Sequence, residues 1–142
     1  MNADVKTLGL PLDHLGIAVY TLSESSKTYE LLGFVPDGDE EEIAAQGVRV
    51  RVFRCGESLV ELLEPTTPES PIRRFLDRRG PGLHHLALRV EQLETEITRL
   101  LAEGARFVGA EPTPSPGRHG TRVVFLHPTW TGGVLVELVE HP

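Results

Sequence analysis

The chain has 142 residues, of which 39% are hydrophobic and 25% charged, the proportions of a soluble globular protein that can form a core. Its formal net charge of −7 argues against nucleic acid as a partner, because phosphate binding needs an excess of cations. No apolar run is long enough to span a membrane, and the first residues, MNADVKTLGLPLD, contain no basic segment followed by an apolar one. Because the single cysteine, Cys55, cannot form an intrachain disulfide, we expect a cytoplasmic protein.

The first half of the chain reads as a strand, a helix and three further strands. Alternation of residue types predicts a strand over 12–19, and Ser23 can cap a helix that runs to residue 32 and ends at Gly33. A second strand begins at 34–35, before the acidic run DGDEEE, which we interpret as a solvated loop. A strand pair over 47–54 and 58–63 completes the half.

The second half shows the same order of elements. We predict a strand over 84–90, a helix over 93–103, a short strand over 106–108 and a closing strand pair over 121–127 and 134–139. Between the halves, Ser70 and Pro71 begin a linker helix that ends near Gly80. The stretch EPTPSPGRHG is too rich in proline for a helix or central strand, so we expect a loop of the kind that borders a site.

The two halves also repeat each other in sequence. Residues 12–33 align with residues 83–104, which pairs His14 with His85 at an offset of 85 − 14 = 71, and matching Val-Glu-Leu sequences pair Glu61 with Glu137. A repeat of this kind predicts an α+β fold in which two tandem βαβββ modules, about 12–64 and 83–140, build one domain over 1–142. Their curved mixed sheet would enclose a cleft with a near two-fold axis.

The repeat places four metal-binding side chains in duplicate. Strand alternation turns His14 and His85 away from the apolar residues beside them and puts His84 on the face opposite His85, so the repeat selects His85. A lone carboxylate in an apolar strand is costly unless a cation meets it, which makes a shared cation the simplest explanation of Glu61 and Glu137. The set of two imidazoles and two carboxylates suits one divalent ion, and Co, Mn, Ni, Zn, Fe and Mg remain open.

Several longer motifs extend this pattern: DHLGIAV at 13–19, SPIRRFL at 70–76, GLHHLALRV at 82–90, and FLHP followed by GGVLVEL at 125–138. With them the chain resembles the vicinal oxygen chelate superfamily, which includes glyoxalases, bleomycin resistance proteins and dioxygenases, and within it the methylmalonyl-CoA epimerase family. The resemblance implies a glyoxalase-like fold, a divalent metal held by His14, Glu61, His85 and Glu137, and usually a homodimer. It also implies interconversion of the C2 epimers of methylmalonyl-CoA through a metal-stabilised enolate.

Epimerisation needs one base on each face of the substrate carbon. The resemblance gives Glu137 as one base; where some relatives carry a second glutamate this chain has Val50, so we expect Glu61 to be the other. The residues expected to contact the acyl-CoA substrate are Gln46, Arg118, His119 and Arg122. For the two linker-helix arginines, Arg73 and Arg74, we favour a solvated helix face, and we interpret His141 as a tail residue.

Two alternatives remain open at this point. A glyoxalase I-type lactoylglutathione lyase uses a similar ligand set, although the linker motif SPI-x-x-FL favours the epimerase. A non-catalytic small-molecule binding or resistance protein of the same fold would tend to lose the ligands, and this chain keeps all four.

Overall fold

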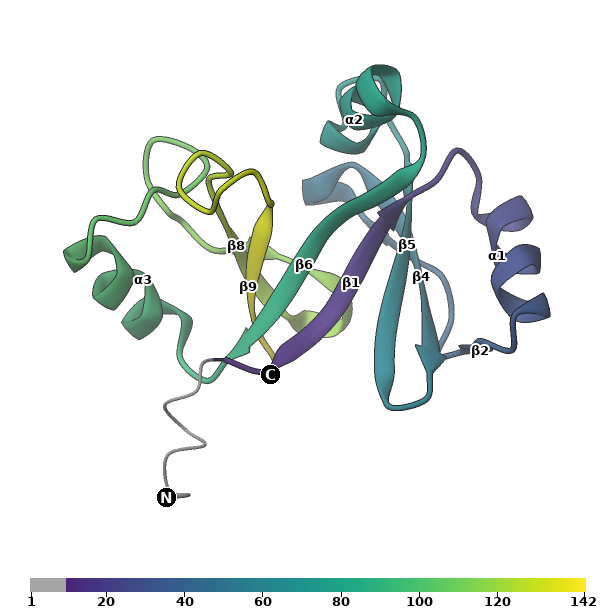
Figure 1. Ribbon diagram of the computed structural model, residues 1–142, viewed down its shortest axis with the longest axis horizontal. Helices are drawn as coiled ribbons and strands as arrows, with labels where there is room; N and C mark the ends of the chain where they lie inside the picture. Colours follow the sequence, from purple (N-terminus) through teal and green to yellow (C-terminus); the bar gives the residue numbers. More distant parts are fainter. Residues whose placement is uncertain (1–9) are drawn as a thin grey trace.

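The computed structural model describes residues 10–142. Residues 1–9 lie outside the described part, and so does most of the N-terminal stretch for which the sequence predicts no targeting segment. Nine strands form one mixed sheet in the order β2-β4-β5-β1-β6-β9-β8-β7, with β3 paired to β4. The strands are β1 (Leu12–Ala18), β2 (Val35–Pro36), β3 (Glu41–Ile43), β4 (Val48–Cys55), β5 (Ser58–Pro65), β6 (Gly82–Val90), β7 (Ser115–Pro116), β8 (Arg122–Leu126) and β9 (Val136–Glu140). The helices are α1 (Leu22–Leu31), α2 (Pro71–Arg79) and α3 (Leu93–Ala102) (Figure 1).

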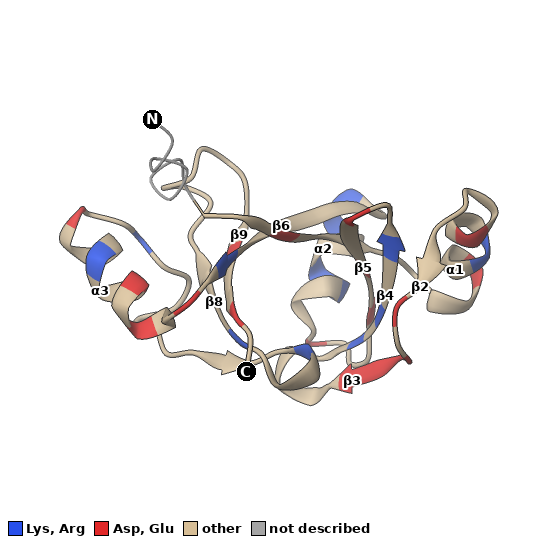
Figure 2. Ribbon diagram, turned by 90° about the horizontal axis from the view of Figure 1, so that it is seen from below, with Lys and Arg blue, Asp and Glu red and all other residues tan. Residues whose placement is uncertain are grey.

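Equivalent strands pair in the same way in the two halves. β1 runs parallel to β5 and β6 runs parallel to β9, while β1 and β6 join the halves as an antiparallel pair. The sheet curls into a half-barrel, and β3 approaches the segment before β8 at the lower edge of Figure 2. The expected α+β fold with a curved mixed sheet is confirmed.

The three helices cover different parts of the sheet. α1 and α3 flank the outer face (Figure 1), where Leu22 packs with Phe53 and Leu62, and Leu93 packs with Leu138. α2 instead places Ile72 and Leu76 against Val48, Val50 and Leu63 of β4 and β5. Residues two apart along a strand share a face, so Leu63 and Glu61 lie on the same side, and α2 closes one end of the concave surface that carries Glu61.

The ends of the helices follow local capping chemistry. Ser70 accepts a hydrogen bond from the Ile72 amide at 3.1 Å and Pro71 opens α2, which confirms the predicted start of the linker helix. For α1 the predicted cap was wrong: Thr21, two residues earlier than Ser23, has the extended backbone of an N-cap and accepts from the Glu24 amide.

Two strand predictions need correction. The acidic run is not only a solvated loop, because β3 pairs with β4 and its Glu42 carboxylate lies 3.5 Å from the Arg49 guanidinium opposite; opposite charges across an edge pair stabilise it. The strand predicted over 106–108 is reduced to one bridge between Phe107 and Leu126. Among the described residues, no helix is long and apolar enough to cross a membrane.

Candidate metal centre and active site

Strand register brings the two halves of the repeat together at the centre of the sheet. Glu61 on β5 lies beside Gly16 of β1, and Glu137 on β9 lies beside Ala87 of β6. The neighbours Gly16 and Ala87 are themselves separated by 87 − 16 = 71, the offset that relates the two histidines. Each glutamate is therefore held at the same place in its module, two residues along from the histidine of the adjacent strand.

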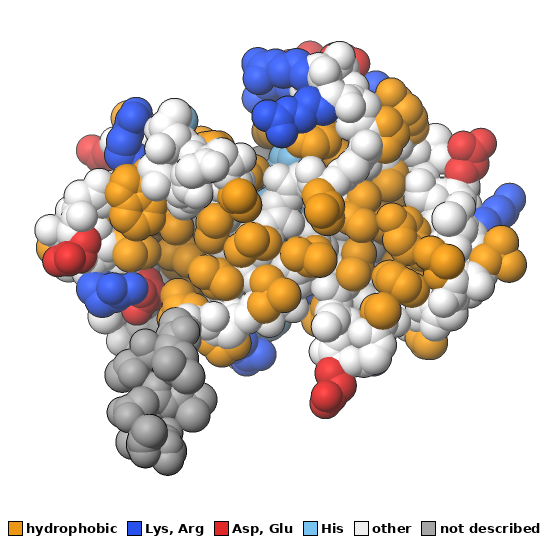
Figure 3. Space-filling model, viewed as in Figure 1, with side chains coloured by type: hydrophobic (Ala, Val, Ile, Leu, Met, Phe, Trp, Pro, Cys, Tyr) orange, Lys and Arg blue, Asp and Glu red, His pale blue; other side chains and the backbone are white. Residues whose placement is uncertain are grey.

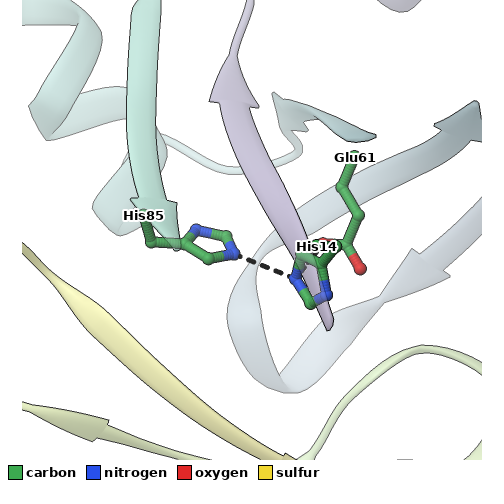
Figure 4. A group of neighbouring side chains, drawn as sticks. All are labelled: His14, Glu61 and His85. Carbon is green, nitrogen blue, oxygen red and sulfur yellow. Dashed lines mark hydrogen bonds and ion pairs between the residues drawn. The ribbon is translucent and has the colours of Figure 1, made fainter. Parts of the chain in front are cut away.

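The ligand atoms of these side chains converge. The His14 Nε2 atom lies 3.2 Å from His85 Nε2, 3.3 Å from Glu61 Oε1 and 3.1 Å from Glu137 Oε1, and His85 Nε2 lies 3.4 Å from Glu137 Oε1. Figure 4 shows His14, Glu61 and His85, from three different strands, pointing at one another. Metal bonds of about 2.1 Å at right angles would place neighbouring donor atoms about 3.0 Å apart, so this spacing fits ligands around one ion.

The charge of the cluster also fits a divalent cation. The cluster holds three carboxylates with buried side chains, of Asp13, Glu61 and Glu137. One guanidinium, of Arg118, contacts the first two, so the cluster lacks two positive charges when the histidines are neutral. Burial alone would lower the pKa of His14, but the charge of Glu61 and hydrogen bonds to the carboxylates raise it to about 11. Among the described residues, Glu137 Oε1 meets the two imidazole rings and no guanidinium. A buried deficit of this size is costly without a counter-ion.

A β-bulge precedes each of the two histidines. Asp13 is the extra residue in β1 and His84 is the extra residue in β6, each lying where the β1–β6 register shifts by one. The bulges turn both side chains toward the ring that follows: Asp13 Oδ2 lies 2.7 Å from His14 Nδ1, and His84 Nδ1 lies 2.9 Å from His85 Nδ1. The expectation that His84 points away from His85 was therefore wrong, because alternation holds only where the register is regular.

Asp13 is held from further sides as well. His141 Nε2 lies 2.7 Å from Asp13 Oδ1, and Arg118 Nη2 lies 3.8 Å from Oδ2. Burial would raise the pKa of Asp13, but the hydrogen bonds with His14 and His141 outweigh burial and lower it to about 2. His141 is thus more than the tail residue that the sequence suggested, since it helps to hold the carboxylate that orients His14.

Gly16 makes room for the second histidine. A Cβ atom at this position would lie 2.1 Å from Cε1 of the His85 ring, far inside contact distance. The absence of a side chain at Gly16 is therefore a requirement of the His85 position, although nothing in the motif by itself singles out this glycine.

The expected substrate residues lie in different places. Arg118 is buried and its Nε donates to Glu61 Oε2, so it belongs to the metal centre and not to an outer rim. Gln46 Nε2 donates to the Pro116 carbonyl at 3.0 Å, which ties the first module to the proline-rich segment of the second. The backbone amide of His119, whose φ is 51°, donates to Glu41 at 3.0 Å.

Arg122 and Val50 do not reach the cluster. Arg122 pairs with Glu94 and Glu140 beside the start of α3, on the outside of the sheet. Val50 is buried and packs with Leu76 in the apolar cluster beneath α2, so this position offers no carboxylate to the cluster.

A route leads from the cluster to the surface. A cavity of about 10 Å³ is lined by His14, Glu61, Glu137, Arg118 and Gln46, among others. Gln46 also lines a neighbouring cavity of about 270 Å³ with mostly apolar walls, in which Val48, Leu63, Phe125 and Leu135 lie beside His85. The metal centre therefore lies at the inner end of an apolar cavity, as in many small-molecule sites.

Two tandem modules around a buried His/Glu cluster define a class of protein. Residues 13–125 match the model of the Glyoxalase/Bleomycin resistance protein/Dioxygenase superfamily, to which the chain belongs. Within it, the mitochondrial methylmalonyl-CoA epimerase of Dictyostelium discoideum is 37% identical, with 91% of this chain and 77% of that protein aligned. The chain is thus a member of the methylmalonyl-CoA epimerase family.

Solved structures agree with this assignment. The methylmalonyl-CoA epimerase of Mycobacterium tuberculosis superposes with a TM-score of 0.86 at 38% identity, covering 93% of this chain and 88% of that one. A methylmalonyl-CoA epimerase in complex with methylmalonyl-CoA and NH4+ superposes with a TM-score of 0.85 at 32% identity, covering 93% and 94%. The glyoxalase-like fold implied by the sequence motifs is confirmed.

Proposed function

We propose that this protein interconverts the C2 epimers of methylmalonyl-CoA, using one divalent metal ion. The observation that carries the proposal is the convergence of side chains on His14 Nε2, which lies 3.2 Å from His85 Nε2, 3.3 Å from Glu61 Oε1 and 3.1 Å from Glu137 Oε1. This buried cluster lacks two positive charges when both histidines are neutral. The names of the related proteins support the substrate. A methylmalonyl thioester has a carbonyl and a carboxylate on either side of C2, and both oxygens suit a hard or borderline cation.

His14, Glu61, His85 and Glu137 would hold the metal. When bound, a divalent cation supplies Lewis acidity that makes the C2 proton easier to remove. Asp13 and His84 keep the two imidazole rings oriented through their Nδ1 atoms. Which of the candidate metals is bound stays open, since the same mixed N/O set suits several of them.

Two carboxylates would exchange the proton at C2. Glu137 is the better supported base, because its carboxylate lies against the two imidazoles and, among the described residues, is not bound by a guanidinium. Glu61 would act on the opposite face, but the buried guanidinium of Arg118 binds its Oε2 atom and its pKa is lowered by the charge of His14, against the effect of burial. The Arg118–Glu61 contact must therefore loosen before Glu61 accepts a proton.

The substrate contacts expected from the sequence separate into two groups. Gln46 and Arg118 line the inner cavity, and we retain both as contacts of the acyl group. His119 lies beneath the site beside Glu41, and Arg122 lies outside the sheet, so neither has structural support as a substrate contact.

The test uses a single epimer of methylmalonyl-CoA and follows appearance of the other epimer. We expect rapid interconversion by the metal-loaded protein and none after chelation, with no turnover of a glutathione hemithioacetal. Turnover of the hemithioacetal without epimerisation would identify a lyase, and no turnover of either substrate would identify a binding protein. A Glu61→Gln variant that keeps both its metal and its epimerase activity would exclude Glu61 as a base.

We further propose that the protein forms a homodimer through the outer face of β1 and β6. Hydrophobic side chains form a band across the middle of the face seen in Figure 3. Leu12 of β1, Leu83 of β6 and Val134, which precedes β9, are large exposed hydrophobic residues. An uncovered apolar surface near the axis that relates the modules suits a symmetric contact with a second copy. Sedimentation of the wild type should show a dimer. Leu83→Lys should dissociate this dimer, whereas Leu31→Lys, on the exposed face of α1, should leave it intact; a monomeric wild type would overturn the proposal.

The cytoplasmic location stays a prediction.

A further inference from the structure

The helix α2 carries four arginines that have no carboxylate partner among the described residues. Six of the eight other arginines lie within 4.0 Å of a carboxylate oxygen. The two exceptions, Arg89 and Arg106, are isolated along the chain, whereas the four on α2 lie together. In a chain with a net charge of −7, leaving four cations together and unpaired is unexpected for a solvated surface. Figure 3 shows them as the blue cluster at the top of the molecule.

Three of these arginines line one cavity. Arg74, Arg78 and Arg79 surround a cavity of about 230 Å³, together with Phe75 and His84. The Arg79 guanidinium lies 5.7 Å from the centre of the Phe75 ring, and the Phe75 and His84 rings meet edge to face at 5.1 Å. The cavity therefore combines positive charge with an aromatic surface.

The basic cavity is continuous with the route to the metal centre. Pro71, His84 and Leu135 line both the basic cavity and the apolar cavity that reaches His85. The path therefore changes character along its length, from a buried metal centre through an apolar middle section to a basic mouth. Because guanidinium groups bind phosphate oxygens in bidentate fashion, the mouth is suited to a phosphorylated end of the ligand.

We propose that Arg74, Arg78 and Arg79 bind the phosphate groups of the nucleotide end of a coenzyme A ester. The inference rests on the proposed function for the position of the acyl end. It departs from the expectation of a solvated helix face for Arg74 and keeps that expectation for Arg73. The apolar middle section then receives the pantetheine arm, and Phe75 offers a ring against which the base can pack. This assignment replaces His119 and Arg122, which line none of these cavities.

The same helix supplies a matched control. Arg73 lies on the other side of α2, beside Pro65, Thr67 and Asp77, and does not line either cavity of the route. Arg73→Gln thus removes the same charge from the same helix without changing the proposed site.

The test compares methylmalonyl-CoA with methylmalonyl-pantetheine, which lacks the nucleotide. For the double variant Arg74→Gln/Arg78→Gln we expect KM for the coenzyme A ester to rise about tenfold, with kcat unchanged, as lost phosphate contacts should do. KM for the pantetheine ester should not change, and Arg73→Gln should behave as wild type. An equal rise for both esters, or an equal effect of Arg73→Gln, would overturn the proposal.

A binding measurement separates this proposal from the proposed function. Adenosine 3′,5′-bisphosphate, titrated calorimetrically into the metal-loaded protein, should bind to wild type and to Arg73→Gln, and much more weakly to the double variant. If wild type fails to epimerise methylmalonyl-CoA but shows this binding pattern, the catalytic proposal fails and the nucleotide site stands. Nucleotide binding that is absent, or indifferent to Arg74 and Arg78, would overturn the nucleotide site even in an active epimerase.

Discussion

Asp13 and His84 occupy equivalent positions in the two modules, since 84 − 13 = 71, and each holds the Nδ1 atom of the histidine that follows it. Their chemistry differs. Asp13 is an anion whose pKa is about 2, whereas burial and the charge of His85 lower the pKa of His84 to about 4 and keep it neutral. A carboxylate increases the basicity of the ring it binds more than a neutral imidazole does, so His14 is the stronger ligand of the two.

The first prediction follows from this difference. Asp13→Asn keeps the size of the side chain but removes its charge, and should weaken metal binding by about 10- to 100-fold, the usual effect of losing an outer partner. His84→Asn should have a smaller effect, because His84 contributes orientation without charge. Competitive titration against a metal indicator measures both affinities, and equal losses would contradict the assigned difference.

A second prediction concerns Gly16. Gly16→Ala would place a Cβ atom 2.1 Å from the His85 ring, so the ring must move away from the cluster and metal affinity should fall by about 10-fold or more. Gly82→Ala is the matched control, because a Cβ there has no atom within 4 Å. Metal content after dialysis distinguishes the two variants; full occupancy in Gly16→Ala would show that the His85 position tolerates a side chain.

A third prediction is that metal binding releases a proton at neutral pH. In the metal-free protein the pKa of His14 is raised from 6.5 to about 11, so the ring is protonated and must lose this proton to bind a cation. Affinity should therefore rise with pH through the neutral range. For the metal-free fold the sign is the opposite: the stability gained from protonated His14 is complete below pH 6.5 and is lost as pH rises toward 11.

Calorimetry checks the proton count. Metal is titrated into the protein at pH 7 in two buffers of different ionisation enthalpy. The difference between the two heats of binding should correspond to the release of about one proton per ion bound. Identical heats in the two buffers would show that His14 is already neutral before the metal binds.

A fourth prediction concerns the buried guanidinium. Arg118→Ala leaves Asp13 and Glu61 without their cation, which should lower the free energy of unfolding of the metal-free protein by about 3 kcal/mol. Arg122→Ala, which removes a pair exposed outside the sheet, should have a much smaller effect. Urea denaturation of chelator-treated protein measures both; similar losses in the two variants would contradict the buried role of Arg118.

The sequence predicts the fold and the convergence of the site because the repeat relates positions that the structure must place symmetrically. His14 and His85 follow from the offset of 71, and strand register then brings Glu61 and Glu137 beside them. The bulges at Asp13 and His84 could not be predicted from alternation, since that pattern assumes a regular register. The repeat contains one signal for these contacts, because a residue with a hydrogen-bonding side chain, Asp13 or His84, precedes each of the two histidines.

Contacts between the modules account for the remaining differences between the predicted and the observed positions of site residues. Arg118 lies in a proline-rich segment whose path is set by distant partners, through the Gln46–Pro116 and His119–Glu41 hydrogen bonds. No local pattern contains this information. The sequence therefore predicted Arg118 as a substrate contact but not its buried position beside Glu61. The cavity beside Arg74 could not be predicted for the same reason, because it is completed by β6 and the segment before β9.

The most direct test of the account is proton NMR of methylmalonyl-CoA in D2O with the metal-loaded protein, its chelated form and Glu137→Gln. We expect deuterium to enter at C2 with the loaded protein only. Glu137→Gln, even where it retains metal, should exchange one of the two epimers at least about 100-fold more slowly, because it has lost the general base on one face of C2. No exchange by the metal-loaded wild type, or undiminished exchange after removal of the metal, would contradict the account.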